Sequence, residues 1–234
     1  NSHDEERSRV GTMTNWLLRD LARNDSEWLI AFWHHPPYTK GTHDSDVEDQ
    51  LIEMREVMLP ILEDNGVDLV LAGHSHIYER SMLLDRAYST PTTANGVILD
   101  DGDGHPEGDG AYRKSAHQHP HEGTVAVVAG NGKGARRLGL SPVHRVSIVE
   151  VGSVLMDLEG DTMTVRMLNS AGVVRDEFQI VKRGEIDPPT PLRDPWSPFG
   201  PSIIPVVRQA EEVELHLIPR PLASDAVVYF TLDG

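Results

Sequence analysis

Histidines follow two short apolar segments of the chain, and their spacing suits metal chemistry. Gly73-His74-Ser75-His76 comes directly after one segment, and His34 comes directly after another. Two histidines two positions apart on a turn can direct their imidazoles to different sides, so they could serve two neighbouring metal ions. Imidazole is a good ligand for zinc, iron, manganese and similar ions. We therefore predict a metal site with His34, His74 and His76, although polar loop residues without a role would show the same pattern.

The elements around these histidines predict a β-α-β unit. Residues 28–33 and 67–72 are continuous apolar runs of strand length, which favour parallel strands buried on both faces. Residues 47–65 carry an apolar stripe at helical spacing and end in Asn65-Gly66, a typical helix C-cap. Ligands of open α/β sheets bind beyond the carboxyl ends of the strands, which is where the histidines stand. Residues 12–23 predict a further amphipathic helix.

The second half of the chain is predicted to be rich in β-structure. Residues 89–123 contain an acidic glycine-rich stretch and three closely spaced histidines, and we interpret them as a long functional or surface loop. Within it, we favour a solvated acidic hairpin over a calcium loop, and solvated histidines over a metal tract. Gly130 to Gly134 predicts a turn beside the site rather than a phosphate-binding loop. Strands are expected at 124–129, 147–151, 154–158, 162–168 and 173–181, the last four antiparallel.

The composition limits the classes of function. The 234 residues carry a formal net charge of −16, which disfavours binding to nucleic acid or to an anionic membrane. A phosphate ester would then need a local positive centre, for which a metal ion is a good candidate. The chain has no cysteine, which excludes disulfides, zinc-thiolate sites and thiol nucleophiles. No apolar stretch approaches the roughly 20 residues that span a bilayer.

Two sequence motifs resemble one enzyme family. Residues 67–80, Val-Asp-Leu-Val-Leu-Ala-Gly-His-Ser-His-Ile-Tyr-Glu-Arg, resemble the closing motif of the calcineurin-like metallophosphoesterases, and the Tyr-Glu-Arg extension looks most like the purple acid phosphatase branch. Residues 32–38, Phe-Trp-His-His-Pro-Pro-Tyr, resemble the histidine motif that precedes it in that family. The resemblance covers roughly residues 10–183. It implies an α/β fold that is part of a four-layer α/β/β/α sandwich.

The resemblance also implies roles for individual residues. His34 and His74 would bind one metal ion and His76 the other, and His43 would contact the substrate phosphate or protonate the leaving group. A solvated loop histidine is the alternative for His43. His35 would lie beside the ligands in a substrate-binding or structural role. The cofactors implied are two divalent or trivalent ions, iron with zinc, manganese or a second iron, and the substrate is a phosphate ester.

The Tyr78-Glu79-Arg80 extension is expected to form a structural network rather than to act in catalysis. The family's earlier motifs, which supply the carboxylate ligands and the metal-bridging aspartate, have no counterpart before His34. Two dications would repel each other without that negative charge. We therefore expect the chain to be the C-terminal part of a catalytic domain, to bind metal weakly and to be inactive alone.

The expected organisation has three parts. Residues 1–183 form the C-terminal part of a metallophosphoesterase catalytic domain, and 184–205 form a Pro-rich linker. Residues 206–234 resemble the beginning of a chitobiase-type C-terminal β-sandwich module. The family resemblance and this module suggest a secreted protein. The expected activity is that of an acid phosphatase-like phosphomonoesterase. Two alternatives are a phosphodiesterase or nucleotidase of the same fold, and an extracellular binding protein that kept the fold without the activity.

Overall fold

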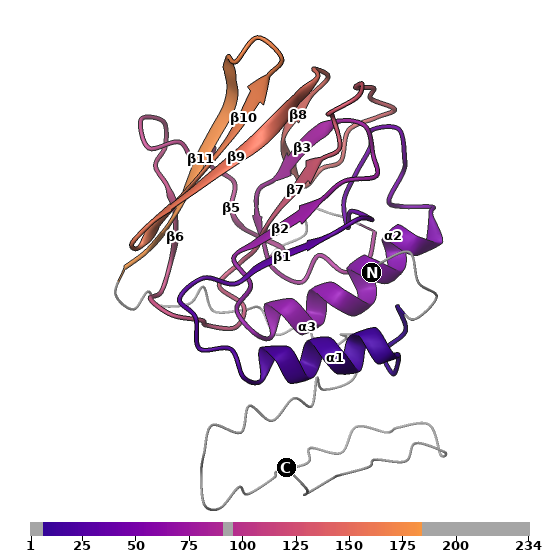
Figure 1. Cartoon of the computed structure of the whole chain (residues 1–234), viewed down its shortest axis with the longest axis vertical. Coiled ribbons are helices and arrows are strands. Elements are labelled where there is room, and N and C mark those ends of the chain that lie inside the picture. Colours follow the sequence, from indigo (N-terminus) through magenta and orange to yellow (C-terminus); the bar gives the residue numbers. More distant parts are fainter. Residues whose placement is uncertain (1–6, 91–95, 184–234) are drawn as a thin grey trace, which may run out of the picture. The chain divides into compact units, whose positions relative to one another are not determined.

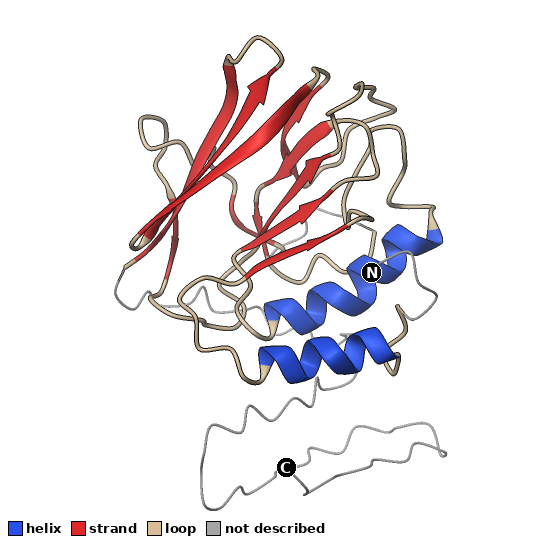
Figure 2. Ribbon diagram, viewed as in Figure 1, coloured by secondary structure: helices blue, strands red, loops and turns tan. Residues whose placement is uncertain are grey.

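The computed structural model describes residues 7–90 and 96–183 (Figures 1 and 2). The predicted linker, 184–205, and the predicted module, 206–234, lie outside the described residues. The described part is a mixed α/β structure of two main sheets and one layer of helices. None of its helices is long and apolar enough to cross a membrane.

A five-stranded sheet carries the motif histidines. Its strand order is β1-β2-β7-β3-β8, and β1, β2 and β7 are parallel, whereas β3 and β8 each run antiparallel to their neighbour. The predicted β-α-β unit is therefore confirmed. The strands are β1 (Ile30–Trp33), β2 (Leu69–Ala72), β7 (Val125–Ala129), β3 (Tyr78–Ser81) and β8 (His144–Ile148).

Helices cover one face of this sheet (Figure 2). α1 (Thr12–Leu21) confirms the first predicted helix. The second is continuous but contains a π-helical segment, in the order α2 (Asp49–Glu53), η1 (Met54–Met58) and α3 (Leu59–Glu63). It ends as predicted, since Gly66 has φ +77° and its N–H donates to the Glu63 carbonyl, while the Val67 N–H donates to the Leu62 carbonyl. That pair of bonds is a Schellman motif, which favours glycine.

The second main sheet has the order β6-β11-β10-β9. Its strands are β6 (Tyr112–Lys114), β11 (Val174–Lys182), β10 (Thr162–Asn169) and β9 (Gly152–Glu159). A small pair joins β4 (Leu83–Leu84) to β5 (Ile98–Asp100). The prediction of a continuous loop at 89–123 is therefore wrong at β5 and β6, because each finds a partner strand distant in sequence. The strand expected at 147–151 instead covers His144–Ile148 and joins the first sheet.

Two apolar cores hold the layers together. One lies between the sheets, where Leu69, Tyr78 and Val127 of the first sheet pack with Val165 and Phe178 of the second. The other lies between the first sheet and the helices. Of the four layers expected, the described residues supply one helical layer and both sheets.

Strand β1 departs from its prediction. It was expected to be buried on both faces, but it is an edge strand, and Phe32 is 81% exposed. A continuous apolar run does not distinguish a central strand from an edge strand whose outer face lacks a cover. Among the described residues, nothing covers Phe32.

Candidate metal-binding site

Parallel pairing brings the ends of β1 and β2 together. The register joins Trp33 to Ala72, so His34 and Gly73 leave the sheet at the same level, and the Gly73 N–H donates to the His34 carbonyl at 3.1 Å. The chain then turns sharply, with His74 at φ +62°. As a result His34 Nε2 lies 2.9 Å from His74 Nδ1. The predicted convergence of these two histidines is what the structure shows.

Two further histidines join this pair. The His35 and His43 rings lie 4.5 and 3.8 Å, centroid to centroid, from the His74 ring. One nitrogen from each of His34, His35 and His74 lies within 4.8 Å of the others, which is close enough for ligands of a single ion. The sequence placed His35 beside the ligands, whereas the structure makes it as close to His74 as His34 is.

Glu48 adds a carboxylate that the sequence did not reveal. Its Oε2 lies 2.8 Å from His43 Nδ1, and its Oε1 accepts a 2.7 Å hydrogen bond from the Asp44 N–H. Ligand atoms of Glu48, His43 and His74 form a second convergent group. Glu48 precedes helix α2, where an acidic residue is common near the positive end of a helix, so no signal in the sequence marked it as part of the site.

Glu79 binds the loop that carries His43 through hydrogen bonds. This side chain is fully buried, and its Oε2 accepts a 2.6 Å hydrogen bond from the Thr39 hydroxyl while the Lys40 N–H donates to its Oε1 at 3.1 Å. Burial raises the pKa of Glu79 to about 7, against the effect of these bonds. At the other end of the loop the His43 N–H donates to Ser75 Oγ at 3.4 Å. These hydrogen bonds attach the His43 loop to Ser75 of the motif and to strand β3, which follows the motif.

His74 is in the protonation state that metal binding requires. Burial, together with the neighbouring His43, His35 and His34, lowers the pKa of His74 to about 4. A neutral imidazole has a nitrogen lone pair to donate at neutral pH, whereas an imidazolium has none. The residues present therefore fit the nitrogen side of a metal site. In the convergent groups around His74 that the described residues form, Glu48 is the single carboxylate.

His76 occupies a different position. The residue is exposed, its N–H donates to Thr42 Oγ1 at 2.9 Å, and its carbonyl accepts from the Arg136 N–H at 2.8 Å. No convergent group among the described residues includes its ring. The structure thus brings together His34, His35, His43 and His74, while the assignment of His76 to a second ion remains a prediction.

The Tyr-Glu-Arg extension forms the structural network that was expected. Asp176 Oδ2 accepts from the Tyr78 hydroxyl at 2.6 Å and from Arg80 Nε at 2.7 Å, and Asp176 Oδ1 accepts from Arg80 Nη2 at 2.8 Å. These bonds join β3 of the first sheet to β11 of the second. The Gly130 turn lies beside the motif as predicted, because a Cβ at Gly130 would stand 2.0 Å from the Ser75 carbonyl oxygen.

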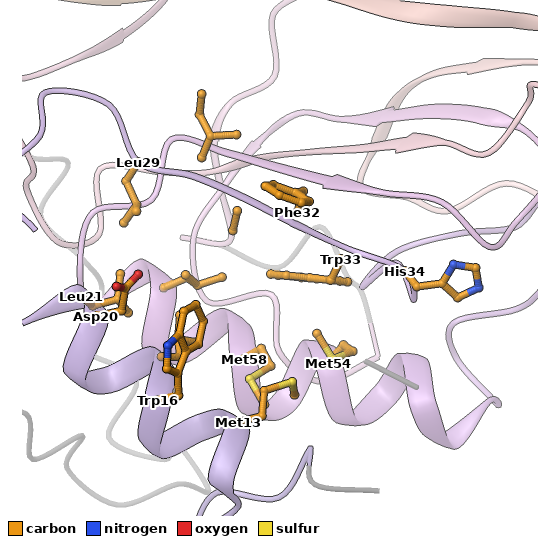
Figure 3. A pocket seen from close by; sticks show the side chains of 14 residues that line it. Met13, Trp16, Asp20, Leu21, Leu29, Phe32, Trp33, His34, Met54 and Met58 are labelled. Carbon is orange, nitrogen blue, oxygen red and sulfur yellow. The ribbon is translucent and has the colours of Figure 1, made fainter. Parts of the chain in front are cut away.

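An apolar cavity adjoins the site along strand β1 (Figure 3). Its volume is about 470 Å³, and helix α1, β1 and the α2–α3 helix line it, with Trp16, Trp33 and Met58 among the lining residues. His34 stands at one end of the lining (Figure 3). Trp16 is 61% exposed, so the apolar surface on this side of the sheet is partly open.

Comparison with known proteins finds similarity to one family of enzymes. Residues 2–78 match the family described as calcineurin-like phosphoesterase. Purple acid phosphatase 18 of Arabidopsis thaliana is 34% identical over 104 residues, which are 43% of this chain and 23% of that protein. Purple acid phosphatase 15 of the same plant is 36% identical over 91 residues, which are 37% of this chain and 16% of that protein.

The fold agrees with these matches. The structure of a purple acid phosphatase from yellow lupin (Lupinus luteus) seeds superposes with a TM-score of 0.56 at 21% identity, covering 75% of this chain and 29% of that one. Residues 2–78 therefore match the calcineurin-like phosphoesterase family, and the relatives of the chain include purple acid phosphatases, which are hydrolases. It spans less than a quarter of the length of the two curated relatives named above.

Proposed function

We propose that this chain provides the histidine side of a two-metal phosphomonoesterase site. The observation that carries the proposal is the contact between the rings of His34 and His74, which follow the carboxyl ends of the paired strands β1 and β2. Burial also lowers the pKa of His74. The family match and the purple acid phosphatase homologues support it. The metals would be iron with zinc, manganese or a second iron, as the family resemblance implies.

The chain's own residues suggest how they would act on a phosphate ester. His34 and His74 would hold a metal through neutral nitrogens, with His35 against them and His76 on the second ion. Two metal ions held there would supply positive charge for the phosphate oxygens and would make a water molecule acidic enough to serve as the nucleophile. Because Glu48 engages His43 Nδ1, the proton for the leaving alkoxide would come from His43 Nε2.

The test is replacement of His74 by Ala in a protein that also contains the carboxylate ligands, with an aryl phosphate as substrate. We expect turnover to fall by at least about 1,000-fold, because a metal ligand and the geometry it sets are lost together. His117→Ala is the matched control, since this exposed histidine lies outside the site. Retention of most of the activity in the His74 variant would refute the assignment.

We further propose that, in residues 1–234 alone, the motif histidines His34, His74 and His76 bind metal weakly and the chain turns over little substrate. Two dications need negative charge to offset their mutual repulsion. In the convergent groups around His74 that the described residues form, Glu48 supplies the single carboxylate. Equilibrium dialysis with zinc or manganese, followed by metal analysis, measures this. Submicromolar binding of two ions to His34, His74 and His76 would contradict it.

Two alternatives have distinct outcomes. A phosphodiesterase or nucleotidase would use the same groups, and parallel assays on monoester and diester substrates separate them, because residues 39–46 and 89–123 would shape substrate access. A binding protein that kept the fold would show neither activity when the carboxylate ligands are supplied. We also propose, from the family resemblance and the composition of residues 206–234, that the protein acts outside the cytoplasm, which cell fractionation would test.

A further inference from the structure

A second cluster of metal-ligating side chains lies away from the motif histidines. Glu63 ends helix α3, Asp64 follows it, Asp85 follows strand β4, and His121 precedes strand β7. His121 Nδ1 is 2.8 Å from Asp85 Oδ1, and His121 Nε2 is 2.9 Å from Asp64 Oδ1. Glu63 and Asp85 are each 2% exposed. The expectation of a solvated histidine at 121 is therefore wrong, since carboxylates enclose its ring.

The cluster contains more negative charge than its fixed cations offset. The cluster has three carboxylates, and the Arg86 guanidinium lies beside one of them, with its Nε 3.4 Å from Asp85 Oδ2. Burial and the Asp85 carboxylate raise the pKa of Glu63 well above its usual range, although the Tyr88 hydroxyl and the Arg86 N–H donate to its Oε2. Burial lowers the pKa of His121, but its bonds to Asp64 and Asp85 outweigh that effect and raise it to about 9. The raised pKa values mean that Glu63 and His121 hold protons more tightly than isolated side chains would, which reduces the net negative charge of the cluster.

The geometry also suits a metal ion in place of those protons. One ligand atom from each of Glu63, Asp85 and His121 lies within 4.8 Å of the other two. Zinc ligands stand about 2.0–2.2 Å from the ion, so the ligands of one ion are about 3–4 Å apart. Small movements of these side chains would bring them to that spacing.

Asp64 adds an independent indication. It contacts the far nitrogen of His121, and a carboxylate in that position commonly orients a metal-bound imidazole and increases its basicity. Its other oxygen, Oδ2, is buried and has no hydrogen-bond partner among the described residues.

We propose that Glu63, Asp85 and His121 bind a single Zn²⁺ ion, with Asp64 orienting the imidazole. Glu63 and Asp85 contribute carboxylate oxygens and His121 contributes Nδ1. With the ion bound through a carboxylate of each acid and a neutral imidazole, the negative charge of the three carboxylates is balanced by Zn²⁺ and Arg86. The ion joins the end of α3 to the segments before β5 and β7, which are distant in sequence. Glu63 precedes β2 and His74 follows it, so the two sites stand at opposite ends of that strand.

Other charged and titratable groups around the cluster set limits on binding. Arg86 Nε is 3.5 Å from His121 Nδ1, so its guanidinium must turn toward solvent to admit the ion, and its side chain is 34% exposed. Tyr88 donates to Glu63, and the buried Tyr38 hydroxyl donates to the Ala87 carbonyl nearby. Arg55 lies farther along the helix, where it binds the carbonyls of Pro37, Ser45 and Tyr88.

The test uses the full chain with His34 and His74 both replaced by Ala, so that the motif site does not contribute. Titration calorimetry with ZnCl₂ near pH 7 should show one Zn²⁺ bound per chain. The same titration in buffers of different ionisation enthalpy should show that binding releases protons, because Zn²⁺ is bound by deprotonated ligands. His121→Ala and, separately, Asp85→Asn in this background should weaken binding by more than about 100-fold.

Controls separate this site from adventitious binding. Glu63→Gln keeps an acceptor for Tyr88 and Arg86 while removing the charge, so it should fold and still weaken Zn²⁺ binding by more than about 10-fold. His117→Ala removes an exposed histidine of the same segment and should leave the affinity unchanged. Absence of Zn²⁺ binding in the double-alanine background would overturn the proposal. Equal weakening by His117→Ala and His121→Ala, in variants with unchanged circular dichroism, would overturn it as well.

Discussion

The bridge between the two sheets allows a quantitative test of why the Tyr-Glu-Arg extension is present. Asp176 accepts hydrogen bonds from the Tyr78 hydroxyl and from two nitrogens of Arg80. The Arg80 side chain is 1% exposed and that of Asp176 is 8% exposed. Asp176→Asn preserves the size of the side chain and removes its charge. A guanidinium cannot lose its proton in a protein, so Arg80 would remain charged and buried without its counterion.

The expected loss is large for a single substitution. Removing one partner of a buried ion pair costs about 3–5 kcal/mol. Arg80 would retain a 3.1 Å hydrogen bond to the Tyr112 hydroxyl and its position 4.6 Å from the Phe178 ring, so we expect the lower half of that range. Each kcal/mol lowers the melting temperature of a domain of this size by about 2–4 °C, so the midpoint should fall by roughly 6–15 °C.

The measurement is urea unfolding of the chain, followed by tryptophan fluorescence and circular dichroism. Asp157→Asn is the matched control, because Asp157 pairs with Arg166 Nη1 at 2.8 Å on the same sheet but is 57% exposed. An exposed pair contributes about 0–1 kcal/mol, so this variant should resemble the parent chain. If the unfolding free energies of both variants fell by the same small amount, burial would not explain the contribution of the Arg80–Asp176 pair to stability.

Three further predictions follow from single residues. Burial raises the pKa of Glu79 to about 7, so its contribution to stability is fully present below the unfolded value near 4.5 and is lost as pH rises through 7. Glu79→Gln should therefore flatten the fall of unfolding free energy between pH 4.5 and 7, by up to about 3 kcal/mol, and an unchanged pH profile by urea titration would contradict this. Gly66→Ala should lower the free energy of thermal unfolding by more than about 1 kcal/mol, because φ is +77° and the new Cβ would stand 2.8 Å from the His119 backbone nitrogen. Gly132→Ala is the control and should be close to neutral, because a Cβ at that position meets no neighbour. Phe32→Thr should change the unfolding free energy by less than about 0.5 kcal/mol, since the side chain is 81% exposed. It should also raise solubility in a precipitation assay. A loss of unfolding free energy above about 2 kcal/mol would mean that Phe32 is packed in solution.

Local pattern was sufficient for much of the β-α-β unit. Apolar runs and a helical stripe predicted β1, β2 and the intervening helix, and Asn65-Gly66 predicted where that helix ends. These features depend on residues close together in the sequence, for which periodicity and capping are direct signals. The same reasoning placed His34 and His74 at one edge of a sheet, because parallel strands present their carboxyl ends together.

Other features depended on contacts that no local pattern records. β5 and β6 were missed because each is short and is defined by its partner strand, which is β4, across an intervening loop, for β5 and the distant β11 for β6. The exposure of Phe32 follows from the place of β1 at the sheet edge, which an apolar run does not reveal. Glu48 was missed since its role arises from the position of His43, five residues earlier on a loop that Glu79 supports.

The sequence by itself indicated the candidate chemistry of this protein, through histidines that follow two apolar segments and a motif in the region that matches the calcineurin-like phosphoesterase family. Tertiary structure alone decided which side chains meet. It placed His35 and His43 against His74, buried Arg80 against Asp176, and enclosed His121 among three carboxylates. The physical reason is that residue type sets what a group can bind, whereas burial and proximity set its charge and its partners, and both depend on how distant segments pack.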